Sequence, residues 1–189
     1  MATPCSTAPV MTTRVELVSL CARCSTRQTT CCQKTEIYVT PGDVRRIAGA
    51  TGLTDFCEFS PPVNPAYGDQ ADDPAWARAV FRPDGSRRIL RHQGNGDCCF
   101  LGATGCSLPA AAKPLICRIY PYEYANGRLT GLATTCPVDL LGPDDALPAA
   151  VGMPPLSECA AWVAQLYREI LVTLGSGLYF IVLVSLSIR

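Results

Sequence analysis

Residues 21–32 have the sequence CARCSTRQTTCC, which places four thiols close together in the chain. The spacing Cys21-x2-Cys24 lets two thiolates reach one metal ion from a tight turn. Cys31 and Cys32 follow after six intervening residues, and adjacent side chains on an extended backbone point in different directions. Cys31 and Cys32 therefore serve different metals, or one of the two is not a ligand.

A second group of cysteines lies far along the chain, at Cys98, Cys106, Cys117 and Cys136. Eight sulfurs in two sets suit either two four-sulfur sites or one polynuclear site. Several thiolates close together repel one another unless a cation neutralises them, and binding of that cation contributes folding energy. The pattern therefore favours a bound metal. Zinc and an iron–sulfur cluster both fit it, with iron–sulfur slightly preferred.

The whole chain has 189 residues, with 12 cysteines but a single histidine, His92. This imbalance excludes zinc fingers with two histidine ligands and histidine-rich metalloprotease helices, so sulfur must hold any bound metal. The 16 basic and 16 acidic side chains cancel, so nucleic-acid binding is not expected. We expect His92 to lie at the surface or to face a turn. A Ser–His–Asp triad would depend on that one residue.

The start of the chain bears on the compartment. No basic residue precedes Arg14, and the first apolar patch is short, so we find no secretory signal. We therefore expect a cytoplasmic, reducing environment, in which clustered cysteines are more often ligands than bridges. The even number of cysteines still permits six disulfides, which leaves a disulfide-stabilised extracellular module as an alternative.

The end of the chain is apolar. Residues 170–188 carry no charge, a length that just spans a hydrocarbon core of about 30 Å. Glycines at 175 and 177 interrupt the run, and residues 178–186 are rich in β-forming side chains, which indicates a buried strand instead. A membrane-associated tail and a soluble core element remain equal alternatives for residues 170–189.

The clearest local prediction is a helix that begins at Pro41. Thr40 is an N-cap residue, Pro41 suits the first helical position, and Asp43 lies three residues after the cap. Val44 and Ile47 give this helix an apolar side, and a glycine, Gly49 or Gly52, can end it.

The remaining elements are short except for the last. We expect strands at residues 36–39, 88–90 and 98–101, the last two joined across a turn at 94–96. A short helix should carry Cys117 and Arg118, and a longer one should run from Leu156 to about residue 174. This predicts a small, irregular α+β fold that is rich in cysteine, has short strands and ends in a C-terminal helix. We expect a disordered N-terminus at 1–14, a cysteine-cluster domain at 15–169 and the apolar tail at 170–189.

Several motifs occur together in a set order. Cys21-x2-Cys24 and the double cysteine are followed by Cys98-x-Phe-Leu and by the segment KPLICRIYP at residues 113–121. In these motifs the chain resembles the YkgJ-type cysteine-cluster family, a zinc- or iron-chelating domain to which flagellin lysine N-methylase is similar. The resemblance covers about residues 21–136.

The resemblance implies a single set of metal ligands. That set is Cys21, Cys24, Cys31, Cys32, Cys98, Cys106, Cys117 and Cys136. It also implies a structural or redox role for the centre. The similarity to the methylase adds an alternative, an S-adenosylmethionine-dependent protein lysine methyltransferase, although no cofactor-binding loop is recognisable. The protein partner stays unknown, and no catalytic residue is assigned.

The sequence departs from the family pattern in two ways. Six residues separate Cys24 from the double cysteine where the family usually has about two, and Lys113 stands where an arginine is common. Four further cysteines have no counterpart in the pattern and are predicted to be small packing residues. These are Cys5, Cys57, Cys99 and Cys159.

Overall fold

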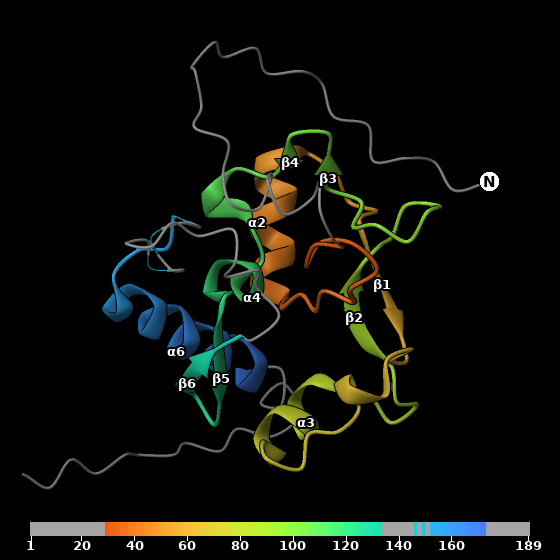
Figure 1. Ribbon diagram of the computed structural model, residues 1–189. Coiled ribbons are helices and arrows are strands. Elements are labelled where there is room, and N and C mark those ends of the chain that lie inside the picture. The colour runs from red at the N-terminus through yellow and green to blue at the C-terminus, as the bar shows by residue number, and fades with distance from the viewer. Residues whose placement is uncertain (1–28, 134–145, 147–148, 150–151, 173–189) are drawn as a thin grey trace, which may run out of the picture.

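The computed structural model describes residues 29–133, 146, 149 and 152–172 (Figure 1). The elements in chain order are α2 (Pro41–Thr51), β1 (Cys57–Ser60), the 3-10 turn η1 (Pro65–Tyr67), α3 (Pro74–Val80), β2 (Arg87–Leu90), β3 (Leu101–Gly102), β4 (Gly105–Cys106), the 3-10 turn η2 (Ala110–Ala112), α4 (Leu115–Ile119), β5 (Tyr122–Ala125), β6 (Arg128–Leu132) and α6 (Leu156–Val172). The fold is a small mixed α+β domain, as the sequence predicted.

Helix α2 begins as predicted. The Thr40 side chain accepts a hydrogen bond from the Asp43 backbone N–H at 2.9 Å, and the Asp43 carboxylate accepts one from the Thr40 N–H at 3.0 Å. This reciprocal capping box satisfies two backbone donors that would otherwise lack partners in the first turn. The helix ends at Gly52, whose φ of 71° is left-handed and therefore favours glycine.

In the described part of the chain, the strands form three separate antiparallel pairs, β1–β2, β3–β4 and β5–β6. Two of the predicted strands are wrong. Residues 36–39 run beside β2 and share two backbone hydrogen bonds with it, but this contact amounts to the isolated Tyr38–Ile89 bridge and not to a strand. Residues 98–100 form a turn rather than a strand, in which Cys98 bridges back to His92, and Leu101 already belongs to β3.

The C-terminal helix α6 confirms the predicted helix as far as Val172. Cys159, Val163, Leu166 and Ile170 recur on one side of it and have no exposed surface. Helices α3 and α4 both pack against this helix, which lies across the lower half of the molecule (Figure 1).

Buried side chains form two clusters. We call the first the aromatic cluster: Tyr38, Trp76, Val80, Leu115, Ile119, Val163, Leu166, Tyr167 and Ile170. We call the second the thiol cluster: Ile37, Val39, Ile47, Phe56, Leu90, Cys98, Phe100 and Leu108. Four partly buried cysteines pack against the thiol cluster. They are Cys32, Cys57, Cys99 and Cys117.

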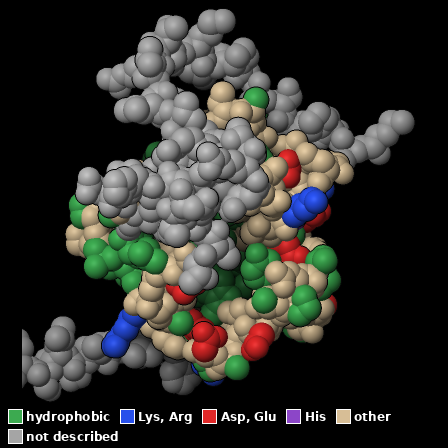
Figure 2. All heavy atoms as spheres, in the orientation of Figure 1, with side chains coloured by type: hydrophobic (Ala, Val, Ile, Leu, Met, Phe, Trp, Pro, Cys, Tyr) green, Lys and Arg blue, Asp and Glu red, His purple; other side chains and the backbone are tan. Residues whose placement is uncertain are grey.

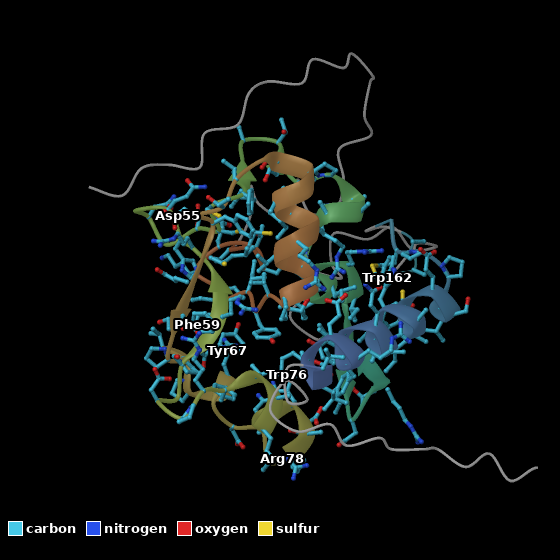
Figure 3. All side chains as sticks on the ribbon, turned by 180° about the vertical axis from the view of Figure 1, so that it is seen from behind. Asp55, Phe59, Tyr67, Trp76, Arg78 and Trp162 are labelled. Carbon is cyan, nitrogen blue, oxygen red and sulfur yellow. The ribbon has the colours of Figure 1, made fainter. Side chains whose placement is uncertain are left out.

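In the aromatic cluster, Trp76 is central. Its ring lies 5.3 Å from that of Tyr38, 5.9 Å from that of Tyr124 and 6.1 Å from that of Tyr167 between centroids. These tilted and edge-on contacts are favourable geometries for aromatic rings. Figure 3 shows Trp76 between α3 and α6, and Trp162 beside α4. The cluster thus joins α6 to the β5–β6 hairpin and α3.

Candidate metal centre

Five of the eight predicted ligands lie in the described residues, and four of them are brought together. Cys32, Cys98, Cys106 and Cys117 all line one cavity and influence one another's charge. Cys31, the fifth, lines the same cavity and is exposed. The other three, Cys21, Cys24 and Cys136, lie outside the described residues.

Backbone hydrogen bonds hold the first two cysteine segments side by side. The Cys98 N–H donates to the Cys32 carbonyl at 2.8 Å, and the Lys34 N–H donates to the Gly96 carbonyl at 3.0 Å. Gln33 and Asp97 form an isolated antiparallel bridge between these bonds. The turn predicted at 94–96 does not join two strands. It does place the backbone of Cys98 beside that of Cys32.

Cys106 and Cys117 come from two further elements. Cys106 ends β4, where it pairs with Leu101 of β3, in the hairpin that directly follows Cys98 and Phe100. Cys117 lies in the middle of the five-residue helix α4, which was predicted to carry it. Four separate segments of the chain thus contribute thiols to the cavity, the first of them two, Cys31 and Cys32.

Hydrogen bonds ease the ionisation of two of these thiols. A hydrogen bond from Cys31 lowers the pKa of Cys32 to about 7, and the nearby Lys113 ammonium acts in the same direction. A hydrogen bond from Cys99 likewise lowers the pKa of Cys98. Such thiols supply the thiolate form that binds metal at neutral pH.

The other two thiols have the opposite shift. Desolvation raises the pKa of Cys106, and it raises the pKa of Cys117 well above its ordinary value. The neighbouring Cys32 and Cys98 add to the rise at Cys117, because a second and third negative charge nearby disfavour another thiolate. A bound cation would remove that repulsion, so the donor set fits a metal ion or cluster.

The cavity has a volume of about 1430 Å³. Its wall extends from the cysteines to the aromatic cluster, including Tyr38, Trp76 and Tyr167. Figure 2 shows a hollow lined by hydrophobic side chains on one face, with acidic side chains at its rim. Within the described residues, no three His, Cys, Asp or Glu side chains converge closely enough to hold an ion directly.

The cysteines predicted to pack are found in apolar surroundings. Cys159 has no exposed surface, and its thiol lies 3.7 Å from the Pro154 carbonyl. Cys57 is half-buried against the thiol cluster. Cys99 packs there too, but it also hydrogen-bonds the thiol of Cys98, a role that sequence reasoning missed. The only sign of this role in the sequence was that Cys99 directly follows Cys98, a predicted ligand. Cys5 lies outside the described residues.

Other predictions have mixed outcomes. His92 is half-buried, and its Nε2 lies 3.1 Å from the Thr35 carbonyl oxygen, so it faces the backbone rather than solvent alone. None of the eight described cysteines forms a disulfide. Among the described helices, none is both long and apolar enough to cross a membrane. The predicted disordered segment 1–14 and residues 173–189 of the apolar tail lie outside the described part.

The fold is that of a small, cysteine-rich domain in which five thiols line one cavity. The family model CxxCxxCC, with the printed description "Putative zinc- or iron-chelating domain", matches residues 20–137, which is more than half of the chain. The chain therefore belongs to this family, as the order of its motifs indicated. No curated protein and no solved structure matches it significantly.

Proposed function

We propose that this chain holds a metal centre through cysteine thiolates and that Cys32, Cys98, Cys106 and Cys117 are among the ligands. One observation carries the proposal. Thiols from four separate segments line a single cavity, and each affects the ionisation of the others. Neighbouring thiols with no cation nearby would repel one another on ionisation, so this arrangement is expected where a metal binds.

An iron–sulfur cluster is the first candidate for the centre, and zinc is the second. A structural zinc ion takes four ligands, whereas Cys31 adds a fifth described thiol to the cavity wall. Three further cysteines of the pattern, Cys21, Cys24 and Cys136, bring the total to eight. This surplus favours a centre with several metal atoms. When bound, it would join distant segments covalently through metal–sulfur bonds and, if it contains iron, could transfer electrons.

Purification under anaerobic conditions tests the proposal. We expect stoichiometric iron with acid-labile sulfide and a broad visible absorption band from thiolate-to-iron charge transfer. Stoichiometric zinc in a colourless protein would support the second candidate. Single Cys→Ser variants at positions 32, 98, 106 and 117 should lose metal, whereas Cys57→Ser and Cys159→Ser should retain it. A metal-free wild-type protein that is fully folded would contradict the proposal.

A further inference from the structure

The Asp43 side chain has no exposed surface, and it accepts hydrogen bonds from outside its own helix as well as from the capping box. One carboxylate oxygen, Oδ2, accepts the Thr40 N–H of the capping box. The other, Oδ1, accepts a hydrogen bond from the Leu115 backbone N–H at 3.0 Å. Asp43 therefore contacts the first residue of α4, which lies 72 positions further along the chain.

Helix α4 has no capping side chain of its own. Its N-cap residue is Pro114, which makes no side-chain cap hydrogen bond. The first N–H groups of a helix lack partners within it and need an acceptor from elsewhere, above all when they are buried. Asp43 supplies that acceptor from α2. The same carboxylate thus caps α2 and the short helix that carries Cys117.

Arg46 holds the Asp43 carboxylate and links it to Glu169 of α6. Arg46 donates from Nη2 to Asp43 Oδ1 at 2.6 Å and from Nη1 to Glu169 Oε1 of α6 at 2.6 Å. Glu169 also accepts hydrogen bonds from the Thr40 hydroxyl and from Gln165. Because the carboxylate is fixed by several partners, its contact with Leu115 fixes α4 relative to α2 and α6.

We propose that Asp43 is the positioning residue that orients Cys117 toward the metal centre. The inference rests on the proposed function, because it assigns a role toward the same centre. A ligand held in place before binding loses less freedom when the metal binds, and outer-shell contacts of this kind are typically worth 10- to 100-fold in metal affinity. Asp43 acts through α4 and does not contact the metal.

Titration of the reduced full-length protein with Co²⁺ tests this role, because thiolate-to-cobalt charge-transfer intensity reports the number of sulfur ligands. Asp43→Asn should bind Co²⁺ about 10- to 100-fold more weakly than wild type, with lower charge-transfer intensity. Cys117→Ser should show the same spectrum. The double variant should be no weaker than Cys117→Ser alone, since both changes remove one ligand.

Asp73→Asn is a matched control. Asp73 is also a buried N-cap carboxylate that caps its own helix, α3, and accepts a distant backbone N–H, that of Asn126 at 2.8 Å. The variant should lose stability, but its Co²⁺ spectrum and affinity should equal those of wild type. An Asp43→Asn protein that behaves like Asp73→Asn in the titration overturns the inference.

A rescue variant covers the case in which Asp43→Asn folds poorly. Pro114→Ser places a side-chain acceptor at the N-cap of α4, which can accept the second or third N–H of that helix but does not restore the contact with α2. Added to Asp43→Asn, it should improve folding without restoring the wild-type Co²⁺ spectrum; a restored spectrum would show that capping alone is sufficient and would contradict the positioning role. If wild type itself binds no Co²⁺, the proposed function falls together with this inference. If wild type binds and Asp43→Asn is unchanged, only the inference falls.

Discussion

The aromatic cluster and the thiol cluster are built on different principles. The aromatic cluster contains no cysteine and is closed by side chains of α3, α4 and α6 that pack directly on one another. The thiol cluster has one buried cysteine and is bordered by four partly buried ones, of which Cys32 and Cys117 line the cavity. In α4, Leu115 is part of the aromatic cluster and Cys117 packs against the thiol cluster, so this short helix contributes to both clusters.

This contrast indicates that the two clusters of this small domain are stabilised by different interactions. Apolar burial is sufficient for the aromatic cluster, because its residues exclude water by themselves. The thiol cluster is bordered by cysteines that line the cavity, and their thiolate form is costly to bury unless a cation neutralises it. We therefore expect the two halves to respond differently to loss of metal, to loss of apolar volume and to a change of pH.

Removal of the metal should have the largest effect. Structural zinc contributes on the order of 10 kcal/mol in small domains, so the metal-free protein should lose much of its stability around the cavity. Hydrogen exchange followed by mass spectrometry should show lost protection at residues 29–35 and 96–119, with α6 less affected. Equal loss of protection in α6 would contradict the division into two halves.

Leu166→Ala should have the next largest effect and should act on the other half. Leu166 has no exposed surface and lies in the aromatic cluster, so truncation leaves a cavity and costs about 2–5 kcal/mol. Denaturant unfolding measures the loss, and metal analysis of the folded variant should show unchanged stoichiometry. A variant that keeps its stability but loses its metal would reverse the assignment of the two clusters.

The smallest expected effect is a difference between Cys32 and Cys117 in their rates of alkylation. In the reduced, metal-free protein at pH 7, iodoacetamide should label Cys32 about tenfold or more faster than Cys117, because the pKa of Cys32 is lowered to about 7. The Cys32 rate should fall below pH 7, as its thiolate is protonated, and should level off above that pH. Peptide mapping follows both sites.

The Cys31→Ala variant serves as the control for this labelling. It removes the hydrogen bond that lowers the pKa of Cys32, so the pKa should rise and the rate at pH 7 should fall. Equal labelling of Cys32 and Cys117 in the wild-type protein would contradict the electrostatic difference between these thiols.

Sequence reasoning was most accurate where structure depends on near neighbours. The capping box of Thr40 and Asp43 involves residues three apart, and the apolar side of α6 repeats every three or four residues, so both were visible in the chain. The predicted strands at 36–39 and 98–101 depended on partners far away. Residues 37–39 exchange two backbone hydrogen bonds with β2, which is the extent of a single bridge and not of a strand.

The candidate site shows the same limit. The order of the cysteines predicted a set of ligands, and the five of that set that lie in the described residues line one cavity. Nothing in the sequence indicated that Asp43 would accept the Leu115 N–H, because no local rule connects residues 72 positions apart. The ion pair between Arg46 and Glu169 was not predicted either, because these residues are also far apart in the chain.

That ion pair has a consequence for the order of folding. Arg46 and Glu169 are separated by 123 positions, so their contact closes a very long loop. Contacts of such high sequence separation form slowly, because chain entropy is lost before they contribute energy. On the ribosome, Arg46 and Asp43 emerge long before Glu169 does. We therefore expect the contact between Arg46 and Glu169, and with it the docking of α2 on α6, to form only after the last helix has been synthesised.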